Sequence, residues 1–83
     1  MQNEIFKTRD FSHSIVLLSL GYRLLELEQG GGNFVRFVFE INPEEAAVLW
    51  DQYWRKEIQV DAKTLIDSIH ELKSRMYGEG GRR

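Results

Sequence analysis

The hydrophobic and polar positions of residues 22–41 form two runs of β-forming side chains around three consecutive glycines. This pattern predicts an antiparallel hairpin. Counting outward from the glycines pairs Gln29 with Asn33, Leu27 with Val35, Glu26 with Arg36, Leu25 with Phe37 and Leu24 with Val38. One face of the predicted hairpin is then apolar, and it consists of Leu25, Leu27, Val35, Phe37, Phe39 and Ile41.

The opposite face of the predicted hairpin mixes charged and apolar side chains. Large apolar side chains on a half-polar face need a cover, which is either a helix of the same chain or a second protein. This outer face is therefore the first candidate for a partner surface. It combines the predicted Glu26–Arg36 pair with Tyr22, Leu24, Phe34 and Val38.

The first helix is predicted over residues 11–20. Thr8 or Asp10 can cap its start, and Gly21 follows its last turn, where helices often end. Apolar side chains lie nearly all round this helix, which is typical of a helix buried centrally or under a partner subunit. They are Phe11, Ile15 and Leu18 on one side and Val16, Leu17 and Leu20 on the other.

Two further helices follow the hairpin. Asn42 is a capping side chain, Pro43 needs no amide partner and Glu45 can return to the cap, so a helix is expected from Pro43 to about Arg55. After a short extended piece, Asp61 caps a third helix over residues 62–77. Its apolar stripe has the spacing i, i+4, i+7 and i+11, and it consists of Leu65, Ile69, Leu72 and Met76.

Residues 4–8 favour a short edge strand, which completes the order β-α-β-β-α-α. The predicted fold is α+β, a small antiparallel sheet of the central hairpin and this N-terminal strand, packed with three helices. If the first strand instead paired in parallel with the hairpin, its crossover would be right-handed. We expect one compact domain over residues 1–78 and a flexible tail over residues 79–83.

Composition limits the function classes. With 83 residues and 42% hydrophobic content, the chain has room for one small core, so burial of more apolar surface in a homodimer or against a protein partner would add stability. The absence of cysteine excludes disulfides and thiol catalysis and favours a cytoplasmic setting. The net charge of −2 argues against coating of nucleic acid, and no apolar run approaches the ~20 residues that cross a membrane.

No group of residues in the sequence predicts catalysis. His13 and His70 have no second metal ligand at helical spacing, and the serines near His13 lack the setting of an activated nucleophile. The three glycines lack the flanking residues of a phosphate-binding loop. We therefore expect no catalytic, cofactor or metal site, and a protein that is not an enzyme.

The predicted second helix carries Trp50, Tyr53 and Trp54 on one arc. That arc favours packing on the sheet, with a protein interface or base stacking as alternatives. The candidate partner surface comprises Tyr22, Leu24, Phe34, Arg36, Val38, Trp50 and Trp54. The alternative function is a nucleic-acid-binding accessory or regulatory protein, with phosphate contacts from Arg55, Lys56, Lys63, Lys73 and Arg75.

The chain up to Gly78 resembles a family of small, uncharacterised bacterial and phage domains. These positions carry capping, core and turn residues, so the resemblance implies a fold and transfers no catalytic residue. The matching residues are Phe6, Thr8, Asp10, Gly21, Phe37, Phe39, Tyr53 with Trp54, Val60 with Asp61, Leu72 with Lys73, and Tyr77.

Overall fold

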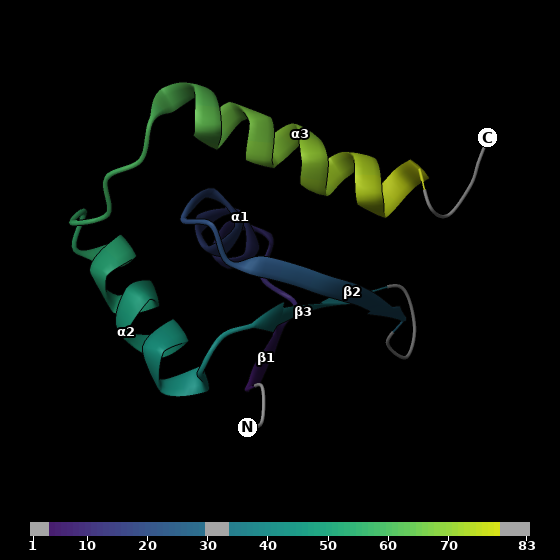
Figure 1. The fold of residues 1–83 in the computed structure, drawn as a ribbon, viewed down its shortest axis with the longest axis horizontal. Helices are drawn as coiled ribbons and strands as arrows, with labels where there is room; N and C mark the ends of the chain where they lie inside the picture. Colours follow the sequence, from purple (N-terminus) through teal and green to yellow (C-terminus); the bar gives the residue numbers. More distant parts are fainter. Residues whose placement is uncertain (1–3, 30–33, 79–83) are drawn as a thin grey trace.

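The computed structural model describes residues 4–29 and 34–78 and has the α+β architecture predicted above (Figure 1). The predicted order β-α-β-β-α-α is confirmed. The turn glycines at positions 30–32 and the predicted tail over residues 79–83 lie outside the described residues. The elements are β1 (Ile5–Thr8), α1 (Phe11–Ser19), β2 (Arg23–Gln29), β3 (Val35–Glu40), α2 (Pro43–Trp54) and α3 (Ala62–Gly78).

The three strands form one sheet in the order β1-β3-β2, and β3 pairs with both neighbours in antiparallel orientation. The predicted small antiparallel sheet is confirmed, and the parallel alternative for the first strand does not occur. Because β3 is central, both neighbouring strands shield its side chains. Phe37, Val38 and Phe39 are accordingly all buried.

The predicted hairpin register is wrong by two residues. Gln29 lies opposite Val35, Glu28 opposite Arg36 and Leu27 opposite Phe37. The reason is the length of the connection, since β2 ends at Gln29 and β3 begins only at Val35. As a result the cross-strand partner of Arg36 is Glu28 and not Glu26.

A β-bulge at Leu25 changes which side chains of β2 reach the core. The register shifts between Leu24 and Glu26, and Leu24 pairs with Phe39. An extra residue in one strand breaks the alternation of faces. Leu24 is therefore 6% exposed in the core and Leu25 is 39% exposed, so the predicted placement of both side chains was wrong.

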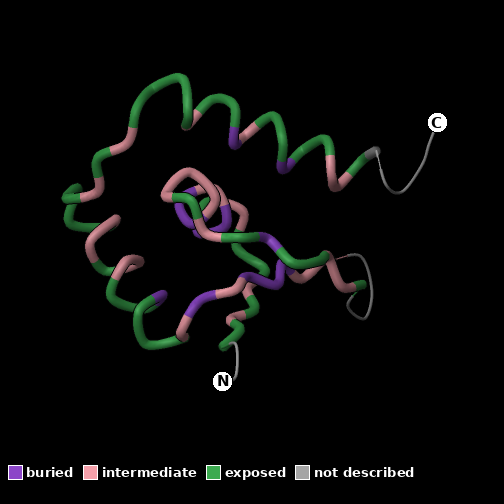
Figure 2. The backbone as a smooth tube through the Cα atoms, viewed as in Figure 1, coloured by how far each residue is buried: buried purple, intermediate pink, exposed green. Residues whose placement is uncertain are grey.

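The core lies on one face of the sheet, and each helix contributes a fully buried side chain to it: Leu17, Ala46 and Leu72. These residues form one cluster with Leu24, Phe37, Phe39 and Ile41. Figure 1 shows α1 between the sheet and α3, with α2 to one side, and Figure 2 shows the buried residues gathered around α1 and the strands. The first helix was predicted to be buried either centrally or under a partner subunit. In the structure, α1 is buried centrally by other elements of the same chain.

Capping residues set both ends of α1. The Asp10 carboxylate accepts a hydrogen bond from the His13 backbone N–H at 2.9 Å, and the Thr8 hydroxyl accepts one from the Asp10 N–H at 3.0 Å. Gly21 has a φ of 99°, which places it in the region that side chains with a Cβ rarely adopt. The N–H groups of Gly21 and Tyr22 donate to carbonyls of the last turn, so the helix ends in a Schellman motif.

Asn42 caps α2 as predicted, but the predicted role of Glu45 is wrong, and the end of the helix does not use glycine. The Asn42 side chain accepts hydrogen bonds from the backbone N–H groups of Glu44 and Glu45, at 2.7 and 3.2 Å. The Glu45 carboxylate does not return to the cap, because it accepts a hydrogen bond from the Tyr22 hydroxyl at 2.7 Å. At the other end, Lys56 occupies the left-handed position with a φ of 64°.

The cap of α3 is Asp61, as predicted, and its carboxylate accepts a hydrogen bond from the Thr64 N–H at 3.2 Å. Leu72 is buried, and Leu65, Ile69 and Met76 are half-buried on the same face. The apolar stripe predicted for this helix therefore faces the molecule. The residues before Asp61 form no strand within the described part of the chain.

Candidate functional site

Three rings from two helices form a continuous stack, which we call the aromatic stack: His13 of α1 and Trp50 and Tyr53 of α2. The centroids of His13 and Trp50 are 4.3 Å apart with an interplanar angle of 14°, and those of Trp50 and Tyr53 are 4.8 Å apart at 1°. The ring centroid of Phe6, in β1, lies 5.1 Å from that of His13. The stack thus joins α2 to α1 and to the edge of the sheet.

Trp54 lies beside the aromatic stack and is 68% exposed. Its ring meets Trp50 and Tyr53 edge-on, with centroid distances of 5.7 and 5.5 Å and interplanar angles of 76°. Such edge-to-face contacts are favourable and hold a ring in a defined orientation. Trp54 is therefore a large apolar side chain that is both held and accessible.

His13 is the buried titratable group of the stack. It is 4% exposed, and its Nε2 atom has no hydrogen-bond partner in the described part of the chain. Burial lowers the pKa of His13, and the Ala46 carbonyl and the Asp10 carboxylate oppose this shift only in part. The ring therefore favours the neutral form.

The residues predicted as a partner surface do not form one surface. Leu24 and Val38 are buried, so neither is available to a partner. Tyr22 is half-buried and donates to Glu45, while Phe34 is half-buried beneath the guanidinium of Arg9. Of the residues predicted as a partner surface, Trp54 is the accessible apolar one. Trp50 is half-buried and contacts the Trp54 ring edge-on.

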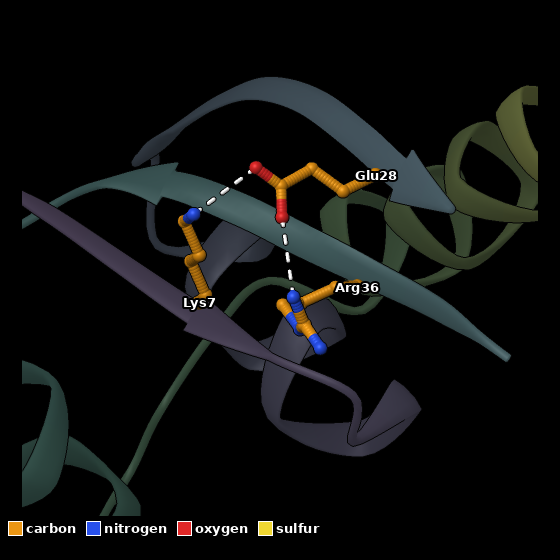
Figure 3. A network of polar contacts seen from close by, with 3 residues as sticks. All are labelled: Lys7, Glu28 and Arg36. Atoms are coloured by element: carbon orange, nitrogen blue, oxygen red, sulfur yellow. Dashed lines mark hydrogen bonds and ion pairs between the residues drawn. The ribbon is translucent and has the colours of Figure 1, made fainter. Parts of the chain in front are cut away.

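The outer face of the sheet carries an ion-pair network that the sequence analysis missed (Figure 3). The Glu28 carboxylate lies 3.0 Å from Lys7 Nζ and 3.4 Å from Arg36 Nη1. The hydrogen bond from Lys7, together with the charges of Lys7 and Arg36, lowers the pKa of Glu28. The sequence signal was the presence of two glutamates, Glu26 and Glu28, on the same face of β2, and the register decided between them.

The basic residues predicted to contact nucleic acid are mostly engaged with carboxylates on the helices. Arg55 pairs with Asp51 at 2.9 Å and also lies 3.7 Å from Glu57. Lys63 pairs with Asp67 at 2.9 Å, and Arg75 lies 3.9 Å from Glu71. Lys56 and Lys73 make no ion pair within the described residues. The five cations therefore do not present a uniformly positive surface.

A family model, Domain of unknown function (DUF5659), matches residues 3–78 of the chain. The chain belongs to this family. Comparisons with curated proteins and with solved structures gave no match. The predicted family resemblance is thus confirmed as far as an uncharacterised domain family.

In this DUF5659 domain, several of the residues that carried the resemblance have structural positions, whereas Trp54 and Tyr77 are exposed. Asp10 and Asp61 cap helices, Gly21 ends α1, and Phe37 and Phe39 lie in the core. At these positions the family pattern therefore reports the fold.

Two of the serines near His13 have local structural roles in the DUF5659 domain. The hydroxyls of Ser14 and Ser19 donate to backbone carbonyls of α1, at 2.9 and 3.0 Å. His13 and His70 lie on different helices, and residues 4–29 and 34–78 contain no group of three side chains able to hold a metal ion. Among the helices in those ranges, none has the length and apolar character needed to cross a membrane.

Proposed function

We propose that this DUF5659 domain is a non-enzymatic interaction module that associates with a second copy of itself through Trp54. The observation that supports this proposal is the exposure of a tryptophan whose ring is held by Trp50 and Tyr53. A held aromatic ring loses little conformational entropy on binding, and tryptophan is among the residues most often found at the energetic centre of an interface.

Further support comes from the size of the domain. A single core in 83 residues gives a stability of only about 3–5 kcal/mol, so apolar area buried between two copies would add a substantial fraction. The cysteine-free composition fits the cytoplasmic setting that this proposal includes.

The first test is sedimentation across a concentration range that reaches high micromolar values. We expect the wild-type chain to associate and Trp54→Ala to weaken association at least tenfold, because truncation of a central aromatic anchor costs about 2 kcal/mol or more. Trp54 makes its described contacts with rings of its own helix, so the variant should keep a folded circular dichroism spectrum.

Tyr77 provides the matched control, because it is an aromatic residue of α3 with 70% exposure. Tyr77→Ala removes a similar exposed ring elsewhere and should leave association unchanged. A wild-type chain that stays monomeric throughout the range would refute the proposal, as would equal effects of the two substitutions.

The alternative function, a nucleic-acid-binding accessory protein, has weaker support because Arg55, Lys63 and Arg75 are paired with carboxylates. It requires salt-dependent binding of oligonucleotides. A mobility-shift assay at low salt with single-stranded and duplex DNA tests it, and a shift lost on charge reversal at Lys56 and Lys73 would favour it.

A further inference from the structure

Three cations gather on the outer face of the sheet, near the hairpin end of β3. We call Lys7, Arg9 and Arg36 the cationic cluster. Lys7 and Arg36 point to the side opposite Phe37 and Phe39, since side chains alternate along a strand. The Cζ atom of Arg9 lies 3.8 Å from the centroid of the Phe34 ring, and that of Arg36 lies 5.7 Å from it. Both guanidinium groups therefore lie within 6 Å of the centre of one phenyl ring.

Arg9 has hydrogen-bonding capacity that the described residues do not use. Within residues 4–29 and 34–78 its side chain makes neither an ion pair nor a hydrogen bond, and its contact is with the face of Phe34. A guanidinium that stacks on a ring keeps its N–H donors directed outward in its own plane. Arg9 is thus positioned by an apolar contact and available to an anion.

The charges around the cluster do not balance. Glu28 is the carboxylate in contact with it, through Lys7 at 3.0 Å and Arg36 at 3.4 Å. Glu26 lies in the neighbouring row, opposite Val38, and makes no ion pair in the described part of the chain. Three positive charges against one contacting carboxylate leave an excess of two.

Glu28 also shows what this position on the sheet favours. Its lowered pKa means that the surroundings stabilise an oxyanion, chiefly through the hydrogen bond from Lys7. The Lys7 and Arg36 side chains are 41% and 38% exposed, so solutes can reach both. Within residues 4–29 and 34–78, the 3.4 Å contact with Glu28 leaves other N–H donors of the Arg36 guanidinium unused.

We propose that the cationic cluster is a binding site for a phosphate monoester dianion, held between Arg9 and Arg36 with Lys7 beside it. The excess of two positive charges matches the charge of the dianion. Guanidinium groups match the geometry of phosphate oxygens, which they bind through paired N–H donors. The site does not involve Trp54 and is independent of the proposed self-association.

The test uses the whole chain at pH 8 and low ionic strength, where phosphate is dianionic and screening is weak. Inorganic phosphate and adenosine 5′-monophosphate are the two sources of the dianion, and adenosine controls for the base. We expect both phosphates to shift the side-chain N–H resonances of Arg9 and Arg36 with millimolar dissociation constants. Adenosine should leave them unchanged.

Substitutions separate this site from a general charge effect. Arg9→Gln and Arg36→Gln should each weaken phosphate binding at least fivefold, whereas Arg55→Gln, which removes the same charge just after α2, should change it less than twofold. Glu28→Gln removes the competing carboxylate and should strengthen binding about threefold or more. Asp67→Asn makes the same change in net charge on α3 and should not strengthen phosphate binding.

Several results would overturn the proposal. One is the absence of phosphate-induced shifts at Arg9 and Arg36, and another is equal behaviour of Glu28→Gln and Asp67→Asn. A decamer of deoxythymidine, whose internal phosphates are monoanionic diesters, provides a third. If it moved these resonances while inorganic phosphate did not, the cluster would bind a nucleic-acid backbone and the monoester assignment would be wrong.

Discussion

At the scale of single residues, His13 couples the fold to pH. Its ring is buried between Phe6 and Trp50, and Nε2 has no partner in the described residues. Stacking on a tryptophan face favours a cation to some extent, yet the lowered pKa means that the loss of hydration outweighs this contact. The neutral ring therefore belongs to the folded state.

The predicted consequence is a loss of stability in mild acid. The unfolded chain, with a histidine pKa near 6.5, takes up the proton before the folded chain does. The contribution of His13 is thus fully present above pH 6.5 and falls as the pH drops below that value, by at most about 1.4 kcal/mol per pH unit. Urea unfolding at pH 7.5, 6.5 and 5.5 measures it.

Substitution identifies the residue responsible for the pH effect. His13→Phe keeps a ring for the stack and should flatten the pH dependence, while His70→Gln, at an exposed position of α3, should leave it intact. Glu28 affects stability at lower pH. Because its pKa is lowered from 4.5, its stabilising contribution is present above about pH 4.5 and is lost as the pH falls below that value. An unchanged slope in His13→Phe between pH 7.5 and 5.5 would contradict the assignment.

Lys56 carries a backbone cost that a glycine would remove. Its φ of 64° places a Cβ in the left-handed region, where the cost is about 1–2 kcal/mol. Lys56→Gly should stabilise the domain by about 0.5–1 kcal/mol, since glycine's greater freedom in the unfolded chain offsets part of the gain. The melting temperature should rise by about 2–8 °C.

Two controls accompany this substitution. Lys56→Ala removes the same charge and retains the Cβ, so it should not raise the melting temperature. Gly21→Ala makes the reverse backbone change at a φ of 99°, where an added Cβ meets nothing within 4 Å, so it should destabilise through the backbone alone. A melting temperature that rises equally in Lys56→Ala and Lys56→Gly would point to charge instead.

At the scale of elements, the bulge in β2 makes two adjacent leucines unequal. Leu24 packs in the core cluster and Leu25 faces solvent. Leu24→Ala should cost about 2–5 kcal/mol through loss of burial and cavity formation, whereas Leu25→Ala should cost less than about 1 kcal/mol. The urea midpoints of the two variants measure the difference. A regular hairpin predicts the reverse order, so a larger loss in Leu25→Ala would refute the bulge.

Elements whose boundaries depend on local chemistry were predictable. Asn42 with Pro43, Asp61, and Gly21 each mark a helix end through hydrogen bonds formed within a few residues. The hairpin register was not predictable, because a run of glycines allows several loop lengths and provides no side chain that selects one. The exchange of Glu26 for Glu28 as the partner of Arg36 follows directly from that error.

The candidate site depended on contacts between distant elements, and the sequence could not specify them. The sequence indicated an arc of Trp50, Tyr53 and Trp54 and favoured its packing on the sheet. In the structure Trp50 and Tyr53 are half-buried and Trp54 is exposed. The sequence did not indicate that His13 stacks on Trp50, nor that Arg9 covers Phe34. Both contacts follow from where β1 and α1 dock, which is a property of the assembled sheet.

At the scale of the whole molecule, the apolar core lies on one face of the sheet, with α1 between the sheet and α3, and ion pairs lie on the other face. Leu17, Ala46 and Leu72 all join the cluster around Phe37 and Phe39. The outer face instead carries the Lys7–Glu28–Arg36 network next to the buried side chain of Val38. Self-association through α2 and phosphate binding on the sheet would therefore use separate parts of the domain and could occur together.

The aromatic stack also determines what light reports about this protein. Both tryptophans of the chain lie on α2, and Trp50 is enclosed between His13 and Tyr53. Intrinsic fluorescence will thus follow the docking of one helix, while far-ultraviolet circular dichroism follows all three. Agreement of the two unfolding curves would show that α2 and the core melt as one cooperative unit. An earlier fluorescence transition would mean that α2 undocks first.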